Sequence, residues 1–201
     1  MRSSFSQPVQ LTRRVALGIA FSGMLALSFV PAPVLAAPKT TLVLGMGIEP
    51  AGLDPTIAAP VAIGQVTWQN IFEGLVRIDH DGKIQPQLAE SWTISDDGKT
   101  YTFKLHSGVS FHDGEAFDSS VAKFALDRAR GDASVNPQKR FFTSIDTIDT
   151  PDATTLVIKL KQPAGSLLYW LGWPASVMVA PKSAENNKTT PVGTGPFKFV
   201  N

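Results

Sequence analysis

Few side chains in this chain of 201 residues belong to the types that carry out chemistry. There is no cysteine, and the three histidines are His80, His106 and His112. His80 and His112 each stand before an Asp-Gly pair, and imidazole together with carboxylate can bind zinc. Asp-Gly is also the common pair of a tight turn, and no His-x-x-x-His spacing accompanies either triplet. We therefore interpret both triplets as turns and predict no metal site.

Other arrangements that support catalysis are also missing from the sequence. Residues 193–195, Gly-Thr-Gly, lack the lysine and the following helix of a phosphate-binding loop, and no Gly-x-Ser-x-Gly motif of a serine hydrolase occurs. The absence of cysteine excludes a thiol nucleophile and a thiolate metal site. Backbone turns between Pro191 and Pro196 account for the two glycines. We predict no catalytic residue, no cofactor and no enzymatic activity.

The N-terminal segment has the polarity pattern of a signal peptide. Residues 1–14 contain three arginines and no acid, and residues 15–30 carry no charge. Small residues then surround a cleavage point between Ala36 and Ala37. The apolar run is shorter than the roughly 20 residues that a membrane anchor needs. We therefore predict a cleaved signal peptide over residues 1–36.

Removing the signal peptide changes the charge balance. Three arginines leave with it, so 15 of the 18 Lys and Arg residues remain against 17 Asp and Glu, and the formal charge changes from +1 to −2. This surface gives no electrostatic reason to expect nucleic acid or an anionic membrane as a partner. Without cysteine there is also no N-terminal lipid anchor. We expect a soluble, monomeric periplasmic protein, and the pair Arg13 and Arg14 leaves open whether the Sec or the twin-arginine pathway exports it.

Hydrophobic spacing predicts intermixed strands and helices in the mature chain. Residues 40–45 are β-branched and apolar, which predicts an opening strand. Apolar residues at i, i+3, i+4 and i+7 predict a helix over residues 62–73. Residues 75–78 then favour a strand that turns through residues 80–83.

The clearest local pattern predicts a β-hairpin around a turn at residues 95–99. Aromatic residues near this hairpin could stack on a ligand, but at strand spacing they more often fill a core, and we favour the core. This applies to Trp92, Tyr101, Phe103 and Phe111. The residues expected on the apolar face of the hairpin are Trp92, Ile94, Tyr101, Phe103 and Leu105.

The second half of the chain continues the mixed pattern. A helix is predicted from an N-cap at Asp118 or Ser119 to about Arg130. The remaining predicted elements are a strand over residues 156–160, a short helical turn that fills the core over residues 167–171, and the start of a strand over residues 197–200.

Three motifs stand in a fixed order along the mature chain. They are Leu-Asp-Pro at residues 53–55, the run over residues 88–114 that contains Asp-Gly-Lys-Thr-Tyr-Thr-Phe-Lys-Leu, and Pro-Val-Gly-Thr-Gly-Pro-Phe at residues 191–197. Together they resemble the family 5 extracellular solute-binding proteins, the peptide- and nickel-binding subunits of ABC importers. The resemblance implies an α/β fold of the class II periplasmic-binding-protein-like type, in which lobes of mixed sheet and helices enclose a ligand about a hinge.

The resemblance also implies how the chain is divided. Residues 37–60 begin lobe I, residues 61–190 hold an accessory lobe and further elements of lobe I, and residues 191–201 return into lobe I. The family region covers about residues 82–201. Members are more than twice as long, so we expect this chain to be a fragment that is truncated before the distal lobe.

The ligand contacts are likewise implied by the resemblance. In peptide-binding relatives the residues just after Leu-Asp-Pro line the cleft, and their main chain pairs with the peptide as an added strand. Here these residues are Ala58, Ala59, Pro60 and Val61. Small side chains allow close approach, although Pro60 has no N–H to donate, and a plain loop leading into the helix is the alternative. For Asp54 we favour a cap of its own backbone over a contact with a ligand amine.

The expected function is that of the substrate-binding component of an ABC importer. It would capture an oligopeptide or dipeptide in the periplasm and deliver it to the membrane permease subunits. The rival readings are an exported hydrolase with catalytic residues beyond Asn201 and an inert truncated fragment. A nickel complex, a sugar and an opine stay open as alternative ligands.

Overall fold

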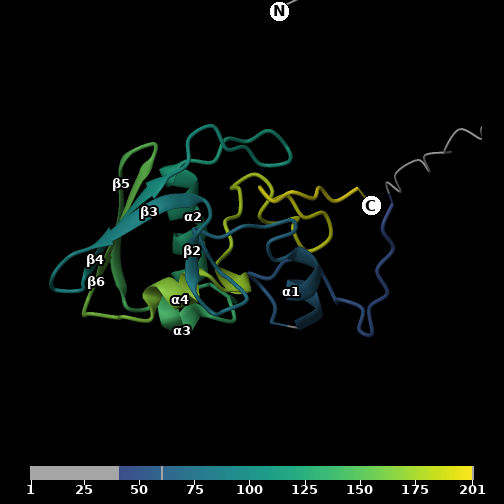
Figure 1. Cartoon of the computed structure of the whole chain (residues 1–201), viewed down its shortest axis with the longest axis horizontal. Coiled ribbons are helices and arrows are strands. Elements are labelled where there is room, and N and C mark those ends of the chain that lie inside the picture. Colours follow the sequence, from purple (N-terminus) through teal and green to yellow (C-terminus); the bar gives the residue numbers. More distant parts are fainter. Residues whose placement is uncertain (1–40, 60, 201) are drawn as a thin grey trace, which may run out of the picture. The chain divides into compact units, whose positions relative to one another are not determined.

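The computed structural model describes residues 41–59 and 61–200. The predicted cleavage point between Ala36 and Ala37 and the candidate ligand contact Pro60 lie outside the described residues. None of the helices in the described ranges is long and apolar enough to cross a membrane. In chain order (Figure 1) the elements are α1 (Val61–Thr67), β1 (Val76–Ile78), β2 (Ile84–Pro86), β3 (Ala89–Ile94), β4 (Thr100–Leu105), α2 (Ser119–Arg130), α3 (Lys139–Phe142), β5 (Ile145–Asp152), β6 (Thr155–Leu160), α4 (Leu167–Leu171) and the 3₁₀ turn η1 (Pro174–Ser176).

A four-stranded antiparallel sheet with the order β3-β4-β6-β5 organises the fold. Trp92 on β3 lies opposite Phe103 on β4, which in turn lies opposite Leu156 on β6. Alternate residues of β4 and β6 are buried, so one face of these strands forms the core. The predicted hairpin and β6 are confirmed. The prediction for Ile94 is wrong, because this residue ends the edge strand β3 beside exposed turn residues and is 45% exposed.

Helix α2 begins and ends where the sequence predicts, and Asp118 is its N-cap. The Asp118 Oδ1 atom accepts hydrogen bonds from the backbone N–H groups of Ser120 at 2.8 Å and Val121 at 3.0 Å. These donors have no partner inside the helix. The helix packs against β5 and β6 (Figure 1). Its buried residues are Ser119, Val121, Ala122, Ala125, Leu126 and Ala129.

The core contains most of the aromatic residues that the sequence assigned to it. Tyr101, Phe103 and Phe111 are buried, whereas Trp92 is half-buried and lies with its ring centroid 6.4 Å from that of Phe103. β5 was not predicted, and it completes the sheet beyond β6. Its burial is sparse because most of its side chains are polar, so its pattern shows no regular apolar alternation.

The helix predicted over residues 62–73 is wrong beyond Thr67. α1 ends there, Gln69 adopts a left-handed φ of 61°, and the N–H groups of Ile71 and Phe72 both donate to the carbonyl of Thr67 at 2.9 Å. Ile71 and Phe72 are nevertheless buried. Their spacing reflects two inward side chains on a tight loop, and such a loop produces the same local apolar pattern as a helix face.

Two further predicted strands are not formed. Residues 41–46 have no regular structure and Val43 is 87% exposed, and residues 197–200 join no sheet, with Phe197 65% exposed. A strand needs a neighbour for its N–H and C=O groups. The Phe197 N–H donates to the Asn70 carbonyl at 3.0 Å, but this single bond does not extend into a ladder, so the apolar run alone does not create a strand.

Candidate ligand cavity

A cavity of about 860 Å³ opens among several short segments that surround α1. Its lining comes from the loop before α1, α1 itself, the turn between β1 and β2, α3, α4 and η1. A volume of this size falls within the usual range for small-molecule sites, about 300–1,000 Å³.

The loop before α1 holds the residues that the sequence put forward as ligand contacts. Ala58, Ala59 and Val61 line the cavity, whereas Pro60 lies outside the described residues. Gly64 on α1 also lines it. Small side chains on this side leave the backbone open to close approach.

Four aromatic side chains from α3, α4 and the residues before η1 form another part of the lining, here called the aromatic wall. The rings of Phe141 and Trp170 stack with centroids 3.4 Å apart and an interplanar angle of 12°. The ring centroid of Trp173 lies 5.3 Å from that of Trp170 and 5.8 Å from that of Tyr169. All four residues line the cavity, so each ring contacts at least one other while the group borders open space.

The aromatic wall was missed by the sequence reasoning. Residues 167–171 were expected to fill the core, and this is confirmed for Leu167 and Leu171, which are buried. These two positions share one helix face because they are four residues apart. Tyr169 and Trp170 point away from that face. The sequence does carry a signal for an aromatic surface. Tyr169, Trp170 and Trp173 are three large aromatic residues in or next to a helix that is too short to bury them all.

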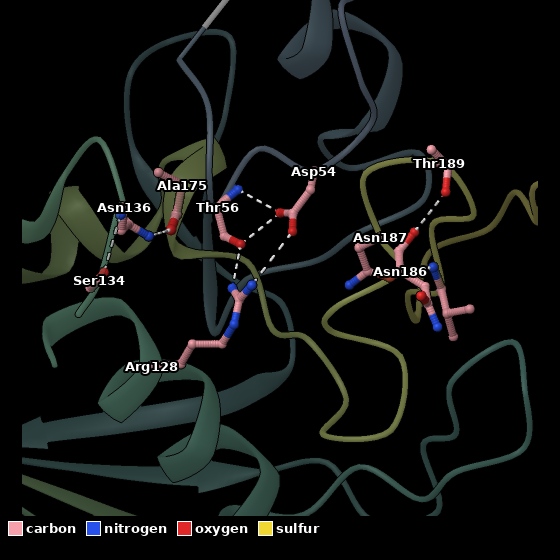
Figure 2. Close-up of polar contacts among 10 residues, drawn as sticks. Asp54, Thr56, Arg128, Ser134, Asn136, Ala175, Asn186, Asn187 and Thr189 are labelled. Atoms are coloured by element: carbon pink, nitrogen blue, oxygen red, sulfur yellow. Dashed lines mark hydrogen bonds and ion pairs between the residues drawn. The ribbon is translucent and has the colours of Figure 1, made fainter.

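Buried polar groups hold the aromatic wall in place. The Ser176 hydroxyl donates to the Trp170 carbonyl at 2.6 Å, and its oxygen lies 3.3 Å from Gln138 Oε1. The Asn136 side-chain amide donates to the Ala175 carbonyl at 2.8 Å (Figure 2). Ser176, Asn136 and Gln138 are all more than nine-tenths buried. These contacts link the residues just before α3 to α4 and η1, the segments that carry the four rings.

The charged groups of the cavity differ in how far they are already paired. Asp79 accepts hydrogen bonds from the Gln85 side chain at 2.9 Å and the Lys83 backbone at 2.8 Å. The bond from Gln85, followed by that from Lys83, lowers the pKa of Asp79. His80 is exposed, and its Nε2 lies 3.4 Å from Asp81 Oδ1. Asp79 therefore serves the β1–β2 turn.

Arg140 is different. Its guanidinium carbon lies 4.6 Å from the centroid of the Phe141 ring, in cation–π geometry. Among the described residues, no carboxylate lies within 4.0 Å of it. Arg140 thus brings an uncompensated positive charge to the cavity lining.

A buried polar cluster anchors the loop that carries Ala58 and Ala59. Asp54 Oδ1 accepts from the Thr56 backbone N–H at 2.8 Å and from the Thr56 hydroxyl at 2.6 Å, so the predicted cap is confirmed. Arg128 on α2 donates through Nη1 to Thr56 Oγ1 at 2.8 Å, and its Nη2 lies 3.9 Å from Asp54 Oδ2 (Figure 2). Asp54 is 1% exposed and its Oδ2 accepts no hydrogen bond among the described residues. Arg128 supplies the nearest positive charge to that oxygen.

The glycine motif near the end of the chain packs against the loop after α1. A Cβ on Gly193 would lie 1.9 Å from the Ile71 carbonyl oxygen, and one on Gly195 would lie 2.4 Å from that of Asn70. Gly195 N donates to the Ile71 carbonyl at 2.9 Å. The glycines are therefore needed for close backbone approach, and neither has a positive φ. The sequence-based interpretation that Gly193 and Gly195 serve only backbone turns is therefore incomplete.

His112 takes part in the same packing. Its Nε2 lies 2.8 Å from the Gly195 carbonyl, and Gly193 N lies 3.4 Å from its Nδ1. In the described part of the chain, no three His, Cys, Asp or Glu side chains gather as a possible metal site. His112 thus has a structural neighbour on each ring nitrogen.

Comparisons with known proteins place this geometry in a family. The profile of the bacterial extracellular solute-binding proteins, family 5 Middle, matches residues 83–201, more than half of the chain. A glutathione-binding protein, GsiB, from Pectobacterium atrosepticum is 37% identical over 177 residues, which cover 86% of this chain and 34% of that protein.

Solved structures agree with the sequence comparison. AgaA from A. tumefaciens R10, in complex with agropinic acid, has a TM-score of 0.71 and 36% identity over 76% of this chain and 32% of that one. NikZ from Campylobacter jejuni, in complex with Ni(L-His), has a TM-score of 0.67 and 28% identity over 77% of this chain and 31% of that one. The described fold is therefore of the α/β periplasmic-binding-protein type, and the chain spans about a third of the length of these relatives. The chain belongs to the family 5 bacterial extracellular solute-binding proteins.

Proposed function

We propose that the cavity is part of the ligand site of a periplasmic substrate-binding subunit of an ABC importer, and that its ligand is a small peptide. The observation that carries the proposal is the position of Ala58, Ala59 and Val61 on the cavity lining. The family resemblance implies ligand contact for the same segment. No chemical step is assigned to the site, because its role is to bind.

The segment around Ala58 suits recognition through the main chain. Its small side chains leave backbone N–H and C=O groups accessible to a peptide that adds as a strand. Recognition of this kind tolerates different ligand side chains. Pro60 has no N–H, so the pairing would interrupt at that residue. The Asp54 and Thr56 cluster fixes the start of the segment.

The ligands named for three relatives bear on the chemical class of the ligand of this chain. GsiB is a glutathione-binding protein, AgaA was solved with agropinic acid and NikZ with a nickel–histidine complex. Glutathione is a tripeptide and histidine an amino acid, so both carry carboxylates. Glutathione supports a peptide ligand, and the carboxylates of glutathione and histidine agree with a ligand carboxylate at the unpaired Arg140.

Delivery to the importer follows from lobe closure. In the proposed mechanism two lobes close on the ligand about a hinge, ligand binding shifts the open and closed populations, and the permease recognises the closed form. Much of the charge pairing with the peptide termini would come from the second lobe.

Isothermal titration calorimetry with glutathione and a set of dipeptides tests the proposal. Ala59→Trp places a large ring at the cavity and should abolish binding. Ala133→Trp is the matched control, because Ala133 is exposed and does not line the cavity. Equal binding by both variants, or no binding of any of these peptides to the unmodified chain, would contradict the proposed function.

A further inference from the structure

Two of the four rings of the aromatic wall expose more than a third of their surface. Tyr169 is 40% exposed and Trp173 is 37% exposed, although both touch other rings. Rings gain from offset-stacked or edge-to-face neighbours at centroid distances of about 4.5–7 Å. Tyr169 and Trp173 have ring neighbours in this range on their inner sides, with centroids 5.4 Å from Tyr169 to Trp170 and 5.3 Å from Trp173 to Trp170. The ring surface that stays free for a ligand is therefore their exposed part.

Hydrogen bonds hold the backbone beneath the aromatic wall. The backbone N–H of Gly172 donates to the Tyr169 carbonyl at 3.1 Å, and that of Trp173 donates to the Trp170 carbonyl at 3.2 Å. Ser176 holds the same Trp170 carbonyl from the buried side. A site whose groups are ordered before binding loses little entropy when the ligand arrives.

A positive charge stands at the edge of the wall. Arg140 lies against the Phe141 ring and has no carboxylate within 4.0 Å among the described residues. Asp79, the carboxylate of the cavity lining, is engaged by Gln85 and Lys83. The cavity therefore joins free aromatic surface to one unpaired cation.

We propose that the cavity selects peptides that carry an aromatic side chain next to a free carboxylate, with Trp173 and Tyr169 contacting the ring and Arg140 pairing with the carboxylate. This inference rests on the proposed function and specifies its ligand class. The alternative occupant of the wall is a segment of protein. A small ligand is favoured because the wall borders a cavity of about 860 Å³ whose lining near Ala58 and Gly64 is small enough to leave room for a ring.

Three probe dipeptides separate the two halves of the proposal. Calorimetry on the purified chain compares Ala-Phe, Ala-Leu and C-terminally amidated Ala-Phe. Ala-Phe should bind about three- to tenfold more tightly than Ala-Leu, from the ring contacts. Ala-Phe should bind at least about tenfold more tightly than its amide, because only the free carboxylate can form a charge-assisted bond to Arg140.

Single variants assign each preference to its residue. Trp173→Leu should remove the preference for Ala-Phe over Ala-Leu, whereas Trp92→Leu, on the sheet and away from the cavity lining, should keep it. Arg140→Gln should remove the preference for acid over amide, whereas Arg77→Gln, an exposed arginine on β1, should keep it. Urea unfolding confirms that each variant is folded.

The outcomes distinguish this inference from the proposed function. If Ala-Phe and Ala-Leu bind equally, or if Trp173→Leu leaves the preference unchanged, the inference is overturned while peptide binding stands. If neither the dipeptides nor glutathione bind, the proposed function fails and the inference with it. If the aromatic wall binds a protein segment instead, Trp173→Leu will leave dipeptide affinity unchanged, which again overturns the inference.

Discussion

Replacing Arg128 tests whether the buried cluster anchors the loop that reaches the cavity. In Arg128→Met the side chain keeps most of its length and loses its charge. Asp54 is 1% exposed and its Oδ2 accepts no hydrogen bond among the described residues, so this change removes its nearest positive charge; Thr56 loses the donor at 2.8 Å.

The magnitude follows from the burial of the two partners. Removing one member of a buried ion pair typically costs about 3–5 kcal/mol, because the other charge is left uncompensated. Arg128 is 23% exposed and its Nη2 lies 3.9 Å from Asp54 Oδ2, so the pair is partly solvated and not tightly bonded. We therefore expect the lower end, a loss of about 3 kcal/mol in the free energy of unfolding, which is a large part of the total for a domain.

Urea unfolding followed by tryptophan fluorescence measures this loss, and a double-mutant cycle assigns it. Asp54→Asn keeps the oxygen that caps Thr56 and removes the charge, so it should cost only about 1 kcal/mol. Combined with Arg128→Met it should cost less than the two single changes together, by about 1 kcal/mol or more. Arg77→Met, at an exposed arginine, is the control and should stay within about 0.5 kcal/mol of the unmodified chain.

Two results would contradict this role of Arg128. If the free energy of unfolding of Arg128→Met lies within about 0.5 kcal/mol of that of the unmodified chain, Asp54 does not depend on the charge of Arg128. If the two changes are simply additive, the 3.9 Å contact carries no coupling.

Three further predictions concern backbone packing and helix capping. Gly193→Ala should destabilise the chain by at least about 3 kcal/mol in urea unfolding, because the added Cβ would lie 1.9 Å from the Ile71 carbonyl oxygen. Gly165→Ala is the control and should be neutral, because an added Cβ there meets nothing within 4 Å. Equal stability of the two variants would contradict the close packing at Gly193. Asp118→Ala should cost about 1 kcal/mol through loss of the N-cap, while Asp118→Asn should cost little, and similar losses in both would argue against capping. Burial raises the pKa of Asp118, but the hydrogen bonds led by that from the Ser120 hydroxyl outweigh it and the net pKa is lowered. A carboxyl with a lowered folded-state pKa stabilises the fold above its unfolded pKa of about 3.9 and loses that contribution as the pH falls further, so Asp118→Asn should flatten the decline in stability below about pH 4; an unchanged acid profile would refute this.

Local patterns predicted the parts of the fold that local interactions decide. The β3–β4 hairpin was predicted because alternation and an Asp-Gly turn occur in one continuous stretch from Trp92 to Leu105, and α2 because Asp118 caps it from the adjacent position. The Asp54 cap was found for the same reason, since its partner Thr56 is two residues away.

Long-range contacts decided the parts that were wrong or missed. The loop after α1 depends on Gly195 donating to the Ile71 carbonyl from more than a hundred residues later, which no hydrophobic period reports. The aromatic wall depends on Phe141 and Trp170 meeting in space. Ala58 and Ala59 were put forward only through family resemblance, because small residues in a loop have no chemical signature of their own.

A crystal structure of the chain with bound Ala-Phe decides whether the cavity is the peptide site. We expect the peptide backbone along Ala58 and Ala59, its ring against Trp173 and its carboxylate within hydrogen-bonding distance of Arg140. A peptide bound elsewhere on the chain, with this cavity left free of it, would show that the cavity is not the ligand site.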